Sequence, residues 1–410
     1  MPFQRELKQT GSWPKPNAPD RGKPTLNNSN VQDRMLAVYR GQCPDQIPIA
    51  IYNRYLPRGV CARKTQNLGL GIIDWYPITS LLAPPWHLLP GYLSEVRDSE
   101  MKVSYSWNQG QRLETRTYTT PVGTVSQQIA IDPTYESDWI QKYYIKQIED
   151  YKVIQYLVEN SVLHRQEDQL QTKMRDLGTD GVVLGRVDRS PYQKLLIELA
   201  GPERLLLDLH TEPEPVLELI EAMDRRMDEM FEAAVDSEVE LIWQPDNITA
   251  DLTPPAMYER FCLPFYEKNG QRLRDAGKRY VVHMDGRLAP LQQLIARSRF
   301  DVVESFSLPE VGGDLTLSQA QAAWPNKVVL PNFPAVLSSK NASEISAYVN
   351  SLFKERKSHA PFMLEVSEDI PPNEWQHVVS CLGHLLVPEP KPLRPPHRPW
   401  ALDTRLDMPH

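Results

Sequence analysis

Three short apolar runs, at residues 280–282, 302–303 and 328–330, each end at or just before a polar residue that could take part in a reaction. The polar residues are His283, Glu304 and Asn332. Helix-length segments separate the runs, and this alternation predicts a parallel sheet that is covered on both faces. Ligands bind at the carboxyl ends of the strands in such sheets. We therefore expect this stretch to form half of an active site.

His283 and Asp285 are two residues apart at a strand end, so in an ideal strand their side chains share a face. Glu304 and Glu368 could supply further ligands to the same metal ion. One imidazole with two or three carboxylates suits zinc, manganese or iron(II). A structural interpretation stays open, with His283 as a hydrogen-bonded barrel histidine and Glu304 as an acid at the start of the next helix.

A second candidate group follows the apolar run at residues 239–243 and consists of Asp246 and Asn247. An acid beside an amide at a strand end can orient a substrate or act as a general acid or base. An Asx-turn is the alternative. Arg54, after the first predicted strand, could bind a substrate carboxylate, or it could be a surface charge. We take Asp246, Asn247 and Arg54 as catalytic candidates.

The elements that must position these residues indicate an α/β fold, a (β/α)8 TIM barrel that spans residues 31–390. Strands are expected at residues 47–52, 181–185, 239–243, 280–282, 302–303, 328–330 and 361–364. Helices are expected at residues 31–39, 150–161, 191–199, 213–235 and 254–276. The alternating segment 103–132 predicts an antiparallel hairpin inserted outside the barrel. Residues 1–30 and the Pro-rich residues 391–410 are predicted to be irregular ends.

The composition narrows the classes of function. The 45 basic and 53 acidic residues give a net charge of −8, and no basic run is present, which argues against nucleic-acid binding. No apolar run is long enough for a membrane span, and the N-terminus lacks the apolar core of a signal peptide. The four cysteines show no CxxC spacing, so we expect reduced thiols. We expect a cytoplasmic protein whose Pro-rich ends could wrap another subunit of a homo-oligomer.

Several segments, taken in their order along the chain, resemble the uroporphyrinogen decarboxylase (URO-D) superfamily, which also holds cobalamin-dependent methyltransferases. The similar segments are residues 34–41, 44–49, 120–124, 264–266, 283–286 and 367–371, together with Asp246. His283 and Asp285 stand where the methyltransferases carry His-x-Cys, and Glu368 stands where they carry a second cysteine. Residues 53–57 resemble only weakly the arginine-rich segment and GRY motif of true uroporphyrinogen decarboxylases.

The resemblance implies a zinc-dependent methyltransferase that moves a methyl group between a small donor and a corrinoid or folate carrier, with the corrinoid held on a partner protein. Acids replace both cysteine ligands of the family, and oxygen ligands leave a metal ion more Lewis acidic than thiolates do. Such an ion would activate a leaving group. The alternatives are a metal-free decarboxylase of the uroporphyrinogen type and a non-catalytic protein that binds a tetrapyrrole or corrinoid.

Overall fold

The computed structural model describes most of the chain. The described residues are 29–56, 59–89, 91–131, 138–357, 360–368, 370–371 and 373–382. Apart from residues 29 and 30, the predicted irregular ends lie outside these ranges.

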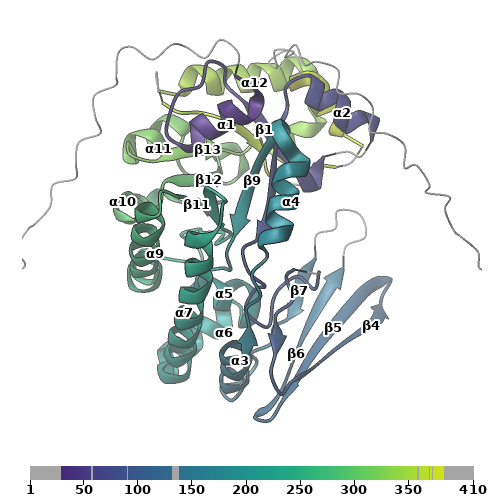
Figure 1. The fold of residues 1–410 in the computed structure, drawn as a ribbon, viewed down its shortest axis with the longest axis vertical. Helices are drawn as coiled ribbons and strands as arrows, with labels where there is room; N and C mark the ends of the chain where they lie inside the picture. The colour runs from purple at the N-terminus through teal and green to yellow at the C-terminus, as the bar shows by residue number, and fades with distance from the viewer. Residues whose placement is uncertain are drawn as a thin grey trace, which may run out of the picture.

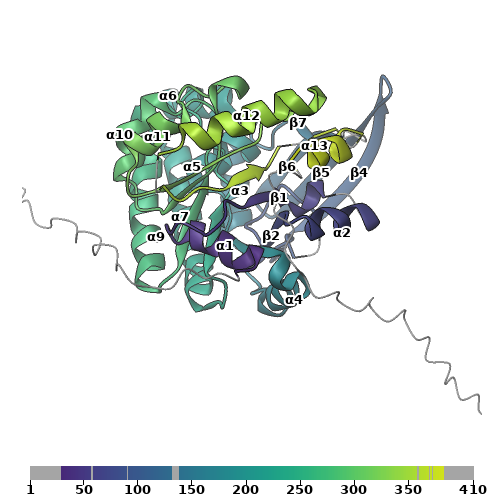
Figure 2. The same cartoon turned by 90° about the horizontal axis from the view of Figure 1, so that it is seen from above.

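Eight parallel strands form a barrel with helices on its outside (Figures 1 and 2). They are β1 (Ile49–Tyr52), β2 (Gly71–Pro77), β9 (Gly181–Arg186), β10 (Leu241–Gln244), β11 (Arg279–His283), β12 (Val302–Phe306), β13 (Val328–Pro331) and β14 (Leu364–Val366). Their order is β13-β12-β11-β10-β9-β2-β1-β14, and a parallel bridge between Asn332 and Glu365 joins the two ends of that order. The predicted (β/α)8 barrel is therefore confirmed.

Helices cover the outside of this barrel and one of its ends. They are α1 (Val31–Tyr39), α2 (Val60–Asn67), α3 (Asp150–Glu159), α4 (Glu167–Leu177), α5 (Pro191–Lys194), α6 (Pro202–Thr211), α7 (Pro213–Asp236), α8 (Pro255–Met257), α9 (Leu263–Asp275), α10 (Gln292–Arg297), α11 (Leu317–Ala323), α12 (Ala342–Glu355) and α13 (Trp375–Leu382). The longest, α7, buries Val216, Leu219, Met223 and Met227, which recur at the spacing of one helix face. Helix α7 packs mainly against α3, α6 and α9.

The apolar core has two parts, one inside the barrel and one between the strands and the outer helices. Successive residues of a strand point to opposite faces. In β2, for example, Ile73 packs in the interior cluster and Ile72 in the outer one. Helix α1 adds Met35 and Tyr39 to the interior cluster. A Cβ on Gly71, the first residue of β2, would lie 2.5 Å from Met35 Sδ, so α1 closes the amino end of the barrel.

An antiparallel sheet of four strands is inserted between β2 and α3 and appears at the lower right of Figure 1. Its strands are β4 (Glu100–Asn108), β5 (Gln111–Thr120), β6 (Gly123–Ile131) and β7 (Trp139–Lys142). The predicted insertion is confirmed in kind, and it is larger than a single hairpin. The extra length arises because β4 begins before residue 103 and because β7 pairs with β6 after the predicted end.

Several elements differ from the sequence prediction. The predicted helix at residues 191–199 becomes π-helical at Leu195–Leu199, and the predicted strand at residues 361–364 lies at Leu364–Val366. Strand β2 was not predicted, because Asp74 and Pro77 interrupt its apolar pattern. Outward-facing Asp74 is stabilised by Asn53 and Lys173, at 3.0 and 2.8 Å, so a charged residue fits within this strand. The helix predicted at residues 254–276 is divided by a π-helical turn at Tyr258–Cys262 into α8 and α9.

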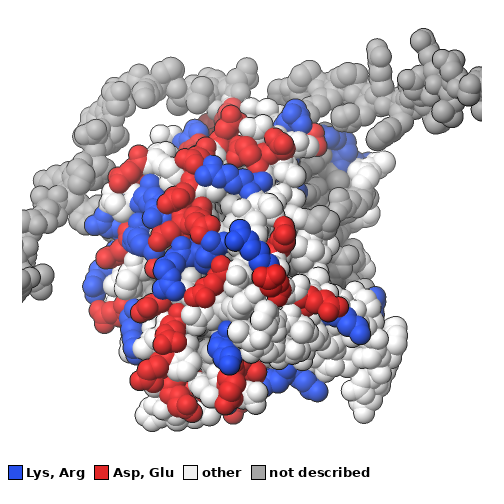
Figure 3. Space-filling view, turned by 60° about the horizontal axis from the view of Figure 1, so that its bottom comes forward, with Lys and Arg blue, Asp and Glu red and all other residues white. Residues whose placement is uncertain are grey.

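Acidic and basic side chains are interspersed over the face shown in Figure 3. Ion pairs also join α7 and α9, for example Lys268 with Asp224 at 2.7 Å and Arg272 with Asp228 at 3.0 Å. Within the described ranges, no helix is both long enough and apolar enough to cross a membrane. Cys262 and Cys381 are buried free thiols.

Candidate active site

The last inward-facing residues of the barrel strands are polar or aromatic, although the interior below them is apolar. In β9, for example, Val182 and Leu184 pack in the interior cluster, and Arg186 is the next residue on that face. We call the corresponding set of residues the mouth cluster. It consists of Tyr52, Trp75, Arg186, Trp243, His283, Glu304 and Glu365. The rings of Trp75 and His283 lie 5.6 and 6.0 Å from the ring of Trp243, so the cluster is continuous across three strands.

His283 and Glu304 form the centre of the mouth cluster. Strands β11 and β12 pair with each other so that His283 lies opposite Glu304. His283 Nδ1 lies 2.7 Å from Glu304 Oε2, and the Glu304 side chain is fully buried. Trp243 Nε1 donates to the same carboxylate at 3.0 Å, and the Tyr52 hydroxyl donates to its other oxygen. These neighbouring strands therefore hold Glu304 in one position against the imidazole.

The other nitrogen of His283 faces a second acid. His283 Nε2 lies 3.6 Å from Asp285 Oδ2, and the Asp285 side chain is 37% exposed. Asn247 Nδ2 donates to the same Asp285 oxygen at 3.2 Å, and Arg189 donates to Asn247 Oδ1 at 2.8 Å. The imidazole thus lies between a buried carboxylate and a partly exposed one, and its Nε2 side is the more open side.

The two acids determine the protonation of His283. Burial disfavours the charged imidazole and so lowers its pKa, but the Glu304 and Asp285 carboxylates outweigh burial and raise the pKa to about 10. For Asp285, burial raises the pKa, and attraction to His283 outweighs it and leaves the pKa below its ordinary value. At neutral pH His283 is therefore an imidazolium that is held by two acids.

Glu365, which the sequence analysis missed, is a further acid at this end of the barrel. It is fully buried in β14, and the Tyr39 hydroxyl donates to it at 3.2 Å. Burial and the nearby Glu304 raise its pKa well above the ordinary value, so Glu365 is a neutral acid. The alternation of Met363 and Glu365 within one strand is the signal that could have identified it, because the two side chains share the inner face.

The predicted catalytic residues occupy three different environments. Asp246 is fully buried, and both of its oxygens accept hydrogen bonds from the fold, namely from Ser190 N–H at 2.7 Å and from the Tyr266 hydroxyl at 2.5 Å. Burial raises its pKa. Asn247 joins the Asp285 side of the cluster, as described above. Arg54 lies in an exposed turn with its guanidinium 4.9 Å from the Tyr55 ring centroid. Of the three residues, only Asn247 contacts Asp285 directly.

The predicted metal ligands do not converge as a four-ligand site would require. Glu304 and Asp285 meet different nitrogens of His283, whereas a metal ion binds only one of them. Glu304 also accepts hydrogen bonds from Tyr52 and Trp243. Glu368 is half-buried after β14, and burial is the main cause of its raised pKa. No three His, Cys, Asp or Glu side chains are grouped for a metal ion in the described part of the chain. This arrangement does not fit four-coordinate zinc, and metal binding stays a prediction.

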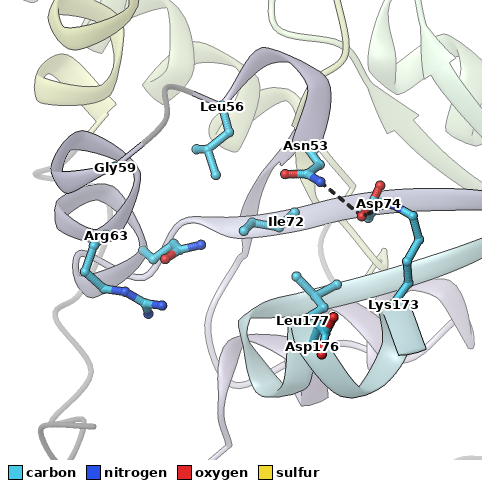
Figure 4. A pocket seen from close by; sticks show the side chains of 10 residues that line it. Asn53, Leu56, Gly59, Arg63, Ile72, Asp74, Lys173, Asp176 and Leu177 are labelled. Atoms are coloured by element: carbon cyan, nitrogen blue, oxygen red, sulfur yellow. Dashed lines mark hydrogen bonds and ion pairs between the residues drawn. The ribbon is translucent and has the colours of Figure 1, made fainter. Parts of the chain in front are cut away.

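A separate pocket of about 460 Å³ lies between α2 and α4, on the outside of β2 (Figure 4). Its lining includes Arg63, Asp74 and Lys173. These charges are paired, because Arg63 meets Asp180 at 3.2 Å and Lys173 meets Asp74 at 2.8 Å. Asp74 follows Ile73 and precedes Trp75, which both pack in the barrel interior, so it faces the opposite way from the mouth cluster. This pocket is therefore distinct from the His283 site.

Residues 193–383 match the model of the family described as uroporphyrinogen decarboxylase (URO-D). This part of the chain is similar to the URO-D family. The match includes His283, Asp285, Glu304 and Glu365, and it begins after Arg186. The acids and the imidazole at the centre of the site therefore lie within the URO-D match, whereas β1, β2, β9 and the inserted sheet lie outside it.

Two solved structures are similar over most of the chain. One is described as a methyltransferase from Methanosarcina mazei, with 12% identity and a TM-score of 0.48, covering 86% of this chain and 98% of that one. The other is described as a xylose isomerase domain protein from Planctomyces limnophilus, with 10% identity and a TM-score of 0.35, covering 83% and 97%. No curated protein matches the chain.

Proposed function

We propose that this URO-D-like protein is a methyltransferase in which the His283 imidazolium protonates the leaving group of a small methyl donor. The observation that carries the proposal is the imidazole held between Glu304 and Asp285, with its pKa raised to about 10. His283 also stands where the sequence resembles the metal-binding histidine of methyltransferases. An acid at this position would activate the same leaving group that a metal ion activates in those relatives.

The Nε2 proton of His283 is the transferable one, because Nδ1 faces the buried Glu304 carboxylate at 2.7 Å. In the proposed step the bond between the methyl carbon and the leaving atom breaks, and its electron pair stays on the leaving atom. The His283 Nε2 proton passes to that atom, and the methyl carbon bonds to the nucleophile of a corrinoid or folate acceptor, which is a substrate. Proton donation of this kind contributes about 10²–10⁴-fold to a rate.

Asp285 lies where solvent can return the proton to Nε2, and its carboxylate favours the charged ring. It lies on the open side of the imidazole, 3.6 Å from Nε2, and is partly exposed to solvent. The contact between His283 Nδ1 and Glu304 Oε2 at 2.7 Å holds the ring in its orientation throughout. If zinc were bound at His283 and Asp285, it would supply Lewis-acid activation of the same leaving group. We assign no step to it, because the four predicted ligands do not converge.

The test uses free cob(I)alamin as the methyl acceptor, with methanol, methylamine, methyltetrahydrofolate or 4-methoxybenzoate as the donor. We expect the wild-type protein to form methylcobalamin with at least one donor, and His283→Gln to be at least about 100-fold slower. His164→Gln is the matched control, because His164 is an exposed histidine that also lies beside an acid, 3.5 Å from Glu95. It should retain the wild-type rate.

Two results would change the proposal. Zinc that copurifies with the wild-type protein and is lost in His283→Ala, with activity abolished by a chelator, would replace the imidazolium with a Lewis acid. No methyl transfer from any of the four donors, together with no effect of His283→Gln on any turnover, would remove the proposed function.

A metal-free decarboxylase is the second candidate. It is favoured because the described acids and histidines form no three-ligand grouping and because His283 carries a proton at neutral pH. In that reaction the proton would pass to a substrate carbon, the bond to the carboxyl group would break, and carbon dioxide would leave. Release of carbon dioxide from uroporphyrinogen without methyl transfer would place this candidate first.

A further inference from the structure

Arg186 is a buried cation that lacks an anionic partner among the residues the structure describes. The residue is 3% exposed, and its Nε–H has no hydrogen-bond acceptor. Other buried cations of the chain are paired. Lys194, for example, meets Asp188 at 2.8 Å and Glu198 at 3.2 Å. Since a buried charge is costly unless it is paired, Arg186 requires an explanation.

Aromatic rings cover the guanidinium of Arg186. Its Cζ lies 4.8 Å from the ring centroid of Trp75, 5.6 Å from that of Tyr92 and 5.9 Å from that of Trp243. Cation–π attraction to these rings offsets part of the cost of burial. The N–H groups lie in the plane of the guanidinium, and the rings do not supply acceptors for them.

The acids that act on Arg186 through space already form ion pairs with other cations. Asp188 and Glu198 influence Arg186 through space, but Asp188 binds Lys194, and Glu198 binds Lys194 and Arg189, the latter at 2.8 Å. Among the described residues, no carboxylate is therefore paired with the Arg186 guanidinium. This leaves the Nε–H of a planar donor group without a hydrogen-bond acceptor in the described part of the chain.

Arg186 also lies at the same end of the barrel as His283. It is the last residue of β9 and pairs in register with Trp243 of β10. The Trp243 ring lies 6.0 Å from the His283 ring, and its Nε1–H donates to Glu304. A molecule that contacts the guanidinium would therefore be separated from His283 and Glu304 by one indole ring.

We propose that Arg186, with Trp75, Tyr92 and Trp243 as its walls, binds the carboxylate of a monocarboxylate substrate whose body is apolar or aromatic. The planar guanidinium offers two parallel N–H groups that match the two oxygens of a carboxylate. A single cation among neutral rings balances one negative charge, which favours a carboxylate over a doubly charged phosphate. The inference deepens the proposed function by naming the substrate class of the same site. Binding of the carboxylate does not depend on that function, and only the reaction after binding rests on it.

Benzoate is the probe for this site, and the full chain is titrated while tryptophan fluorescence is followed, because Trp75 and Trp243 would line the site. We expect binding to the wild-type protein and binding at least about tenfold weaker to Arg186→Met, since a hydrogen-bonded ion pair is lost. Arg112→Met is the control, because Arg112 lies over the Tyr105 ring at 4.4 Å on the exposed β4–β5 surface. It should bind benzoate as the wild type does.

Thermal unfolding separates binding from a structural role. Replacing an unpaired buried charge with an apolar side chain of similar size leaves stability unchanged or raises it. We therefore expect the Tm of Arg186→Met without ligand to equal or exceed that of the wild type, and benzoate to raise only the wild-type Tm. A lower Tm with unchanged benzoate affinity would show a structural arginine and overturn the proposal.

Two further ligands test the assignment to a carboxylate. Benzyl alcohol has the same ring without the charge, and phenyl phosphate carries a second negative charge. Equal binding of benzyl alcohol and benzoate, or tighter binding of phenyl phosphate than of benzoate, would overturn it. Because these assays measure binding alone, they remain decisive whether or not methyl transfer is observed.

Discussion

The proton on His283 depends on its neighbours more than on the imidazole itself. A buried histidine without charged partners would be neutral, because burial disfavours the cation. Here Glu304 is fixed by Tyr52 and Trp243 and lies 2.7 Å from Nδ1. The charge of one residue is therefore maintained by hydrogen bonds from two other strands.

We predict that Glu304→Gln lowers the pKa of His283 from about 10 toward, or below, the ordinary value of a histidine. The proton is lost as the pH rises through the pKa, so the wild-type imidazolium persists up to about pH 10, and in the variant it disappears at lower pH. NMR titration of histidine-labelled protein measures this shift, with His283→Gln used to assign the signal.

Glu95→Gln is the control for that titration, because Glu95 lies beside the exposed His164 and should leave His283 unchanged. A wild-type His283 signal that titrates near pH 6.5, with no change in Glu304→Gln, would contradict the predicted imidazolium. It would also remove the proton donor on which the proposed function depends.

Helix α1 shows how an element outside the β/α repeat supports the barrel. A capping box at Asn30 and Asp33 starts the helix. Its buried side places Met35 in the interior cluster and brings the Tyr39 hydroxyl to Glu365. The helix thereby closes the amino end of the barrel and contacts Glu365 of the mouth cluster.

We predict that Met35→Ala lowers the free energy of unfolding by about 2–5 kcal/mol, because the fully buried side chain leaves a cavity that the closed end cannot refill. Met174→Ala in α4 is the matched control, and since Met174 is 36% exposed its change should be about 0.5 kcal/mol or less. Urea denaturation measures both. Similar values for the two variants would show that α1 is not packed against the barrel as described.

At the scale of the whole molecule, the barrel and the inserted sheet differ in how they are stabilised. The sheet is joined to the barrel side by Gln127 Nε2, which donates to the Glu198 carbonyl at 2.8 Å, and by Arg116, which donates to the Trp86 carbonyl. Strand β4 is one of the two edges of the inserted sheet, and its Tyr105 and Trp107 side chains are exposed. The barrel strands, in contrast, have a partner on each side.

We predict that backbone amides of β4 exchange with solvent at least about tenfold faster than those of β11, because an exposed edge strand opens more readily than a strand in the barrel wall. Hydrogen–deuterium exchange of the full chain measures this difference. Equal protection of β4 and β11 would contradict an exposed edge, and it would indicate that another chain covers β4, as in the homo-oligomer expected from the sequence.

Local pattern determined much of the architecture. The apolar runs that became β9 to β13, and the amphipathic spacing of α1 and α7, are properties of consecutive residues, so the sequence alone predicted the barrel. Strand β2 could not be recognised in this way, because the partners of its Asp74 come from elsewhere in the chain.

The sequence by itself determined that His283, Asp285 and Glu304 follow strand ends and so lie on one rim of the barrel. Only the tertiary structure decided that the two acids meet different nitrogens of the imidazole, and that Glu365 and Arg186 face the mouth. The physical reason is that every barrel strand is buried on both faces, so composition does not distinguish inward from outward residues. The partners that set each charge come from strands far apart in the sequence.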